Sequence, residues 1–160
     1  MAWTTPRTWA TGETVTATLM NTHVRDNLNA LGGTWTAYTP AIGGTGWSIG
    51  TTGSAATGWY LSAGKLTLFQ AALTFGTVGA TFGSGAMTIS IPVTGAHNTF
   101  GAGYANHAGT WYPVTFIIAA GSAVVTMRNN ASPLANVVST VPFTWAAADA
   151  VTINGFVEST

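Results

Sequence analysis

The hydrophobic pattern of the chain changes its period near residue 33. Before that point, apolar residues recur at helical spacing between a polar N-cap residue, Thr16, and a glycine stop at Gly32 and Gly33. This pattern predicts a helix of about 15 residues. On an ideal helix, the apolar residues and one flanking asparagine form a narrow stripe. The stripe consists of Ala17, Met20, Val24, Asn27, Leu28 and Leu31.

After residue 33, apolar and polar residues alternate in short runs, which is typical of β-strands. The run "TGWYLSAGKLTLFQAALTFG" predicts a hairpin that turns near Ala63 and Gly64. In "GAMTISIPV", Met87, Ile89 and Ile91 share one face. Further strands are predicted at 99–106, 111–119, 123–128, 136–141 and 150–157, whereas the Gly/Ser/Thr-rich region 41–54 is predicted to be a long loop.

These patterns predict an all-β fold, a β-sandwich or jelly roll of about 7–8 strands, preceded by an extended N-terminal arm and one short α-helix. Residues 1–33 are expected to form the arm and the amphipathic helix, a unit for anchoring or oligomerisation. Residues 34–160 are expected to form the β-sandwich domain. Trp3 and Trp9 are candidate anchors in the arm, since a tryptophan side chain fills an apolar groove on a partner protein well.

The narrow stripe of the predicted helix has two readings. The helix either packs across the β domain or forms a self-association seam around a symmetry axis, with Asn27 helping to fix the register. We favour the seam, because an isolated helix of this length is marginally stable and needs a partner.

Composition supports association and argues against several classes of partner. Only 5% of the residues are charged, and the formal net charge is zero, so clustered basic residues for nucleic acid or an acidic membrane surface are lacking. A chain with so few charges is poorly protected against association. The sequence contains no cysteine, and we find neither a signal-peptide pattern nor an apolar run long enough to span a membrane. Synthesis in a cytoplasm is therefore expected.

The candidate chemistry is sparse, and we expect no enzyme, no cofactor and no metal site. The four carboxylates form no acid–base pair along the sequence, and the three histidines lack the spacing of a metal site; they are Glu13, Asp26, Asp149 and Glu158, with His23, His97 and His107. Aromatic residues are the remaining lead. Trp47, in the predicted loop, and Trp111 are candidates for exposed stacking on a glycan.

The segment "TPRTWATGETVTATLMNTHVRDNLNAL" resembles the N-terminal segment of small virion surface proteins of tailed bacteriophages, especially those of actinobacterial hosts. The stretches "GTWTAYTPAI", "GKLTLFQAALTFG", "FGSGAMTISIPV" and "PFTWAAADAVTINGFVE" resemble the compact β domain often attached to that segment. Proteins of this kind are capsid decoration, minor structural or tail-fibre components.

The resemblance implies a non-enzymatic, trimeric virion protein. Its small size favours a capsid decoration (cement) protein that binds the major capsid protein on the outside of the head and stabilises the shell. The alternative is a tail-tip or tail-fibre component, which would contact tail proteins and recognise a host-surface glycan. In either case the expected location is the virion, and the expected state is a homo-oligomer.

Overall fold

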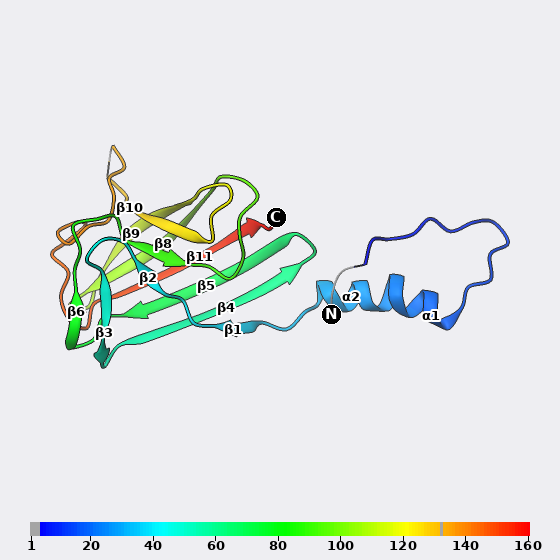
Figure 1. Ribbon diagram of the computed structural model, residues 1–160, viewed down its shortest axis with the longest axis horizontal. Helices are drawn as coiled ribbons and strands as arrows, with labels where there is room; N and C mark the ends of the chain where they lie inside the picture. The colour runs from blue at the N-terminus through cyan, green and yellow to red at the C-terminus, as the bar shows by residue number, and fades with distance from the viewer. Residues whose placement is uncertain (1–3, 132) are drawn as a thin grey trace.

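An all-β domain follows one helical segment in the computed structural model, which describes residues 4–131 and 133–160 (Figure 1). The helical segment consists of α1 (Ala17–Met20), a π-helical turn η1 (Asn21–Arg25) and α2 (Asp26–Leu31). The described residues form eleven strands: β1 (Thr36–Tyr38), β2 (Ile42–Gly43), β3 (Ser48–Thr52), β4 (Ala55–Ala63), β5 (Leu66–Thr74), β6 (Val78–Thr81), β7 (Thr88–Ser90), β8 (Thr99–His107), β9 (Thr110–Ile118), β10 (Val124–Asn129) and β11 (Ala150–Glu158).

Nine of these strands form one curled antiparallel sheet in the order β1-β4-β5-β11-β8-β9-β10-β7-β2. Strands β3 and β6 form a separate two-stranded sheet. The longest ladders join β4 to β5, β5 to β11 and β8 to β9, and each runs over nine residue pairs. The predicted all-β fold is confirmed, and the curled sheet is compatible with a jelly roll.

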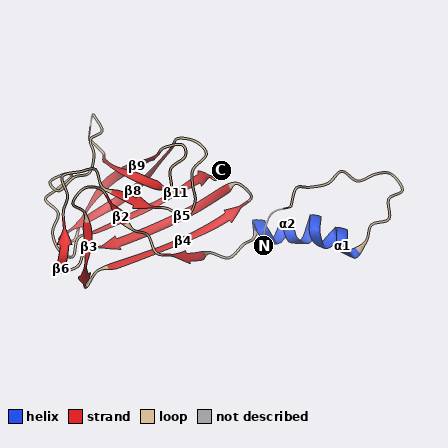
Figure 2. Cartoon of the chain, viewed as in Figure 1, coloured by secondary structure: helices blue, strands red, loops and turns tan. Residues whose placement is uncertain are grey.

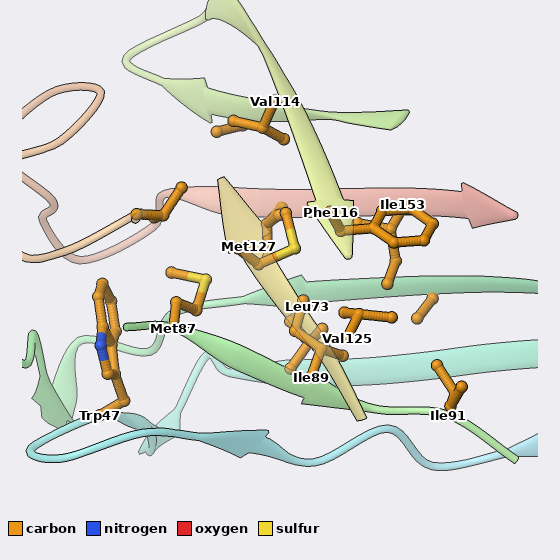
Figure 3. Packing of buried hydrophobic residues seen from close by; sticks show 14 of the residues in the cluster. Trp47, Leu73, Met87, Ile89, Ile91, Val114, Phe116, Val125, Met127 and Ile153 are labelled. Atoms are coloured by element: carbon orange, nitrogen blue, oxygen red, sulfur yellow. The ribbon is translucent and has the colours of Figure 1, made fainter. Parts of the chain in front are cut away.

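The core lies on the inner face of the curl, where strands from both halves of the sheet face each other (Figure 3). Alternation explains this arrangement, because every second residue of a strand points to the same face. In β5 the buried apolar residues are Phe69, Ala71 and Leu73, and in β11 they are Val151, Ile153 and Val157. Strands β7, β9 and β10 contribute the opposite wall, with Ile89, Val114, Phe116, Ile118, Val125 and Met127.

One end of the core is closed by an aromatic cluster of Trp47, Phe75, Phe82, Phe143 and Trp145. The ring centroids of Trp47 and Phe75 are 5.9 Å apart, and those of Phe75 and Trp145 are 5.4 Å apart. Edge-on and tilted contacts at such separations are favourable between aromatic rings. The cluster therefore fixes the segments around β3 and β6 onto the main sheet.

The helical segment stands to one side of the sheet, and the arm starts beside α2, loops out beyond α1 and then enters α1 (Figures 1 and 2). Thr16 is the N-cap, and its hydroxyl accepts a hydrogen bond of 3.3 Å from the Leu19 amide. α2 ends at Leu31, directly before Gly32, so both predicted ends of the helix are confirmed. None of the described helices is long and apolar enough to cross a membrane.

The structure corrects two of the predicted segments. The region 41–54 is not a loop throughout, since it contains β2 and β3, whose two and five residues are too short to produce a clear alternation. Conversely, the residues at 136–141 form only isolated bridges, Arg128 with Asn136 and Val138 with Val141. The predicted number of strands is too low because the short strands β1, β2, β3 and β6 were not predicted.

Candidate functional surfaces

The apolar side chains of the helical segment are largely uncovered. Met20 is 43% exposed and Leu28 is 61% exposed, while Ala17 is exposed and Val24 is half-buried. The β domain does not cover these residues, because only the end of α2 approaches strand β4. This contradicts the reading in which the stripe packs across the β domain. The side chain of Leu31 lies outside the described residues.

The π-helical turn changes the geometry of the stripe. A π-helical bond joins residues five apart rather than four, so that η1 holds about one residue more than an α-helical turn. One residue corresponds to about 100° of rotation. Residues after η1, such as Leu28, are therefore rotated by about that angle from the positions that an ideal helix gives them.

Asn27 occupies a different setting from the one its place in the stripe suggests. Its side chain is 5% exposed, and its amide exchanges two hydrogen bonds with the backbone of Thr4. The Asn27 Oδ1 atom accepts from the Thr4 amide at 2.9 Å, and the Asn27 Nδ2 atom donates to the Thr4 carbonyl at 2.8 Å. A third contact of 3.2 Å runs from Nδ2 to the carbonyl of His23. In this chain, Asn27 ties the arm to the helix.

The arm is shaped by its few charged residues. Arg7 forms an ion pair with Glu13, and Glu13 also accepts a hydrogen bond of 3.2 Å from the amide of Ala10. The guanidinium carbon of Arg7 lies 4.9 Å from the ring centroid of Trp9, which is a cation–π contact. Trp9 remains 40% exposed. The other predicted anchor, Trp3, lies outside the described residues.

Trp47 does not stack on ligands from the surface, and the prediction of its exposure is wrong. The side chain is 8% exposed and belongs to the aromatic cluster. Its indole Nε1 donates a hydrogen bond of 2.8 Å to the carbonyl of Gly85, which satisfies the only polar group of the ring. A Gly-rich sequence neighbourhood suggested a surface loop, but the glycines allow the backbone to pass closely around this ring: a Cβ atom on Gly44 would lie 3.0 Å from the Trp47 side chain.

Trp111 is exposed, as predicted for a stacking residue, and it has an aromatic neighbour. It is 62% exposed at the start of β9. The ring of Tyr104, on β8, lies edge-on to it with the centroids 6.3 Å apart. Both side chains stand on the outer face of the sheet, away from the core. The sequence does not predict that Tyr104 lies beside Trp111, because their distance depends on the β8–β9 register.

The structure brings together one pair of titratable groups that the sequence separates by 42 residues. The Nδ1 atom of His107 lies 2.9 and 3.0 Å from the two carboxylate oxygens of Asp149. Asp149 is 3% exposed and also accepts a hydrogen bond of 2.7 Å from the Ala146 amide. The imidazole ring stacks on Phe143 with the centroids 4.8 Å apart. The carboxylate and Phe143 together fix the orientation of the His107 ring.

A hollow of about 380 Å³ adjoins this pair. A carboxylate that orients a histidine is also found in nucleophilic catalysis, where the histidine activates a nearby hydroxyl or thiol. The described residues that line the hollow offer neither group; they are Asn106, His107, Ala108, Gly109, Ala146, Ala147, Ala148 and Asp149. The contact between His107 and Asp149 joins the end of β8 to the segment before β11.

The remaining charged groups lie apart from this pair. His97 Nε2 is 3.5 Å from Glu158 Oε2 in an exposed contact, and Arg25 pairs with its neighbour Asp26. Within residues 4–131 and 133–160, no group of three or more histidine, cysteine or carboxylate side chains is placed to hold a metal ion.

No protein-family model matches this sequence, and comparison with curated proteins and with solved structures likewise gives no match.

Proposed function

We propose that this chain is a non-enzymatic structural protein of a tailed-bacteriophage virion, and that it acts as a homotrimeric capsid decoration protein. The observation that carries this proposal is the helical segment, which stands to one side of the β domain with Met20 and Leu28 exposed and Val24 half-buried. A helix of this length is marginal alone, and its apolar side chains gain stability when other copies cover them. Helices from three copies would close around a common axis.

The arm supports contact with a capsid shell. Its base is fixed by the hydrogen bonds between Thr4 and Asn27, and its far part presents Trp9, which Arg7 holds from one side. A tryptophan presented on a pre-shaped loop loses little conformational freedom when it enters a groove of the major capsid protein. Each such contact is modest, but a trimer would make three of them at once, and multivalency raises the combined affinity.

The surface composition fits an assembled protein. On the outer face of the sheet, the β4–β5 hairpin carries alanine, threonine, leucine and tryptophan side chains. Its charged residue, Lys65, lies in the turn. A protein that lives as a free monomer normally keeps more charge on its surface. Neighbouring proteins in a virion would cover part of this surface. Synthesis in the host cytoplasm followed by docking on the finished head fits such a role.

The experiment compares phage heads with and without this chain. Heads that lack it are expected to lose their DNA at lower temperature or under milder osmotic shock than complete heads. Purified Met20→Asp protein should fail to form trimers and should fail to restore the heads, whereas Thr18→Asp, which changes an exposed polar residue of α1, should restore them. Heads that are equally stable with and without the chain would overturn the cement role.

A second function is favoured by one observation, the exposed pair of Tyr104 and Trp111. Exposed aromatic rings stack on the apolar faces of sugar rings, as they do on other flat ligands. This would suit a tail-tip or tail-fibre component that recognises a host-surface glycan. Trp111→Ala should then abolish adsorption of the phage to its host, while Trp35→Ala, another exposed tryptophan outside the pair, should not. Unchanged adsorption with intact particles would exclude this function.

A further inference from the structure

A row of apolar side chains crosses the outer face of the sheet over five neighbouring strands. It consists of Leu61, Leu68, Phe156, Phe100 and Ile117, from β4, β5, β11, β8 and β9. The ladders place Leu61 opposite Leu68, Leu68 opposite Phe156, and Phe100 opposite Ile117. The β11–β8 ladder ends at the pair Asn154 and Ala102, and Phe156 and Phe100 lie two residues beyond that pair on the same outer side of their strands. Neighbouring strands are about 4.8 Å apart, so this outer row is about 19 Å long.

Three of the five side chains of the outer row are exposed in the single chain, and Leu61 and Ile117 are half-buried. Phe100 is 67% exposed and Phe156 is 55% exposed, and Leu68 is exposed beside them. Trp59 and Leu66 extend the apolar surface along the neighbouring strands, and both are exposed. An aromatic side chain has roughly 150–250 Å² of surface, so each exposed ring leaves on the order of 100 Å² uncovered. Together with Tyr104 and Trp111, these side chains expose an apolar area on the order of 600–700 Å². This is close to the roughly 800 Å² that each partner contributes to a stable interface.

The charges of this face lie at its margin. No member of the outer row is ionisable. The neighbouring row contains Trp59, Gln70, Asn154, Ala102 and Thr115, and it reaches a charged residue, Arg128, only on β10 beyond the β9 end of the outer row. Lys65, His97 and Glu158 gather at one end of the strands, beside Leu66 and Phe156. Enrichment in aromatic residues with depletion of charge at the centre is typical of protein–protein interfaces. A strongly charged partner would find no complementary group in the middle of this face.

We propose that this face is covered by the same face of a second copy of the chain, in a two-fold dimer. The outer row is centred on β11, so a two-fold axis that lies in the interface and crosses the middle of the row brings Phe156 against Phe156. Leucine and phenylalanine on both sides of the centre then meet apolar side chains of the other copy. Two sheets pack face to face about 10 Å apart, which leaves room for one layer of these side chains from each copy.

This two-fold contact is separate from the helical seam of the proposed trimer. Gly33 approaches Leu61 at the β4 end of the row, where an added Cβ atom would lie 3.1 Å from the Leu61 Cδ1 atom. Beyond that point the helical segment leads away from the sheet (Figure 1). The two surfaces thus adjoin without overlapping, and a chain that uses both would build assemblies of dihedral symmetry. The dimer does not require the virion role.

The absence of cysteine from the sequence makes a cross-linking test direct. Asn154→Cys places one thiol on the outer face, two residues from Phe156 and on the same side of β11. With a short bis-maleimide, the full-length Asn154→Cys protein is expected to give at least ten times more covalent dimer than Thr140→Cys, which places its thiol on an exposed loop. Phe156→Asp, added to Asn154→Cys, should reduce the dimer to the level of the control.

Sedimentation velocity provides the second measurement, and Phe100→Ser provides a milder variant that also weakens the dimer. Both altered phenylalanines are exposed, so circular dichroism should show folded proteins. Equal cross-linking of Asn154→Cys and Thr140→Cys, or an unchanged yield after Phe156→Asp, would overturn the two-fold dimer. Met20→Asp separates the two proposals, since it should abolish trimers and leave the Asn154→Cys cross-link intact.

Discussion

Phe116 lies over Gly101, its partner in the β8–β9 ladder, and the tip of the phenylalanine ring fills the space that a side chain on Gly101 would need. The same ring reaches Gly155 on β11, where an added Cβ atom would be 2.7 Å from the Phe116 Cζ atom. Two glycines on neighbouring strands therefore form the seat of one large core residue.

Gly101→Ala should lower the free energy of unfolding by about 1–3 kcal/mol, because the new methyl group overlaps a fully buried ring. Urea denaturation monitored by fluorescence measures the change. Ala102→Ser, at the next and outward-facing position, should change the value by less than about 0.5 kcal/mol.

A double variant tests the cause of that loss. Phe116→Leu shortens the ring that blocks Gly101, so Gly101→Ala should cost less in the Phe116→Leu background than in the native chain. Equal costs in both backgrounds would show that the ring is not the obstacle.

Asn27→Ala should release the arm without weakening the helix. The substitution removes both hydrogen bonds to Thr4, while alanine is a better helix former than asparagine. Two lost hydrogen bonds of about 0.5–1.5 kcal/mol each correspond to roughly a five- to hundred-fold rise in local opening. Trypsin cleavage after Arg7, followed by mass spectrometry, should accelerate accordingly. Asn29→Ala, an exposed asparagine of the same helix, should leave the cleavage rate unchanged.

Tyr38→Phe should stabilise the protein and remove part of its sensitivity to alkali. The Tyr38 hydroxyl is buried, and no described group is placed to form a hydrogen bond with it. Burial also raises the pKa of Tyr38 from 10.0 to about 12, because the phenolate is poorly solvated there. Between pH 10 and 12 the folded chain thus holds a proton that the unfolded chain has lost, and the free energy of unfolding falls as pH rises.

Urea denaturation at several pH values compares the two proteins. In Tyr38→Phe the decrease between pH 10 and 12 should be smaller, while below pH 10 the ionisation of Tyr38 makes no difference. Tyr104→Phe, which removes an exposed hydroxyl, serves as the control. A decrease of the same size in Tyr38→Phe and in the native chain would contradict the assignment to Tyr38.

Ala108→Gly should stabilise the β8–β9 hairpin. Ala108 and Gly109 form its two-residue turn, with φ angles of 48° and 83°, and a turn of this kind favours glycine or asparagine at both positions. Relief of the alanine strain should exceed the entropic cost of glycine, for a net gain of about 0.5–1 kcal/mol. Thermal unfolding measures the gain. Ala120→Gly, in a turn where the alanine has no positive φ, should instead be neutral or destabilising.

The local patterns predicted the long elements well, for reasons that particular residues make clear. The alternation in β5 and β11 depends only on residues that are close in sequence, and so does the cap at Thr16. The hairpin that turns at Gly64 and the start of the helix can therefore be predicted from local patterns. Contacts between distant residues carry no such signal. His107 and Asp149 meet because β8 pairs with β11, and Trp47 is buried because Gly85 and Phe75 close around it.

The π-helical turn shows a second limit of pattern reading. The predicted stripe assumed equal steps of rotation from Ala17 to Leu28, and η1 adds a residue in the middle. Asn27 shows a separate limit. Helical spacing placed Asn27 on the flank of the stripe, but its hydrogen-bond partner, Thr4, lies 23 residues earlier in the arm. Whether the stripe forms a seam stays a prediction.

The place of β11 in the sheet has a consequence for synthesis of the protein. A ribosome makes β11 after the other ten strands, yet β11 joins β5 to β8 in the middle of the sheet. Until it emerges, β5 and β8 each lack one hydrogen-bonding partner, and an unpaired strand edge is open to the wrong neighbour. Crowded polysomes would therefore favour misassembly between nascent chains, and delayed release or chaperone binding would favour the correct fold.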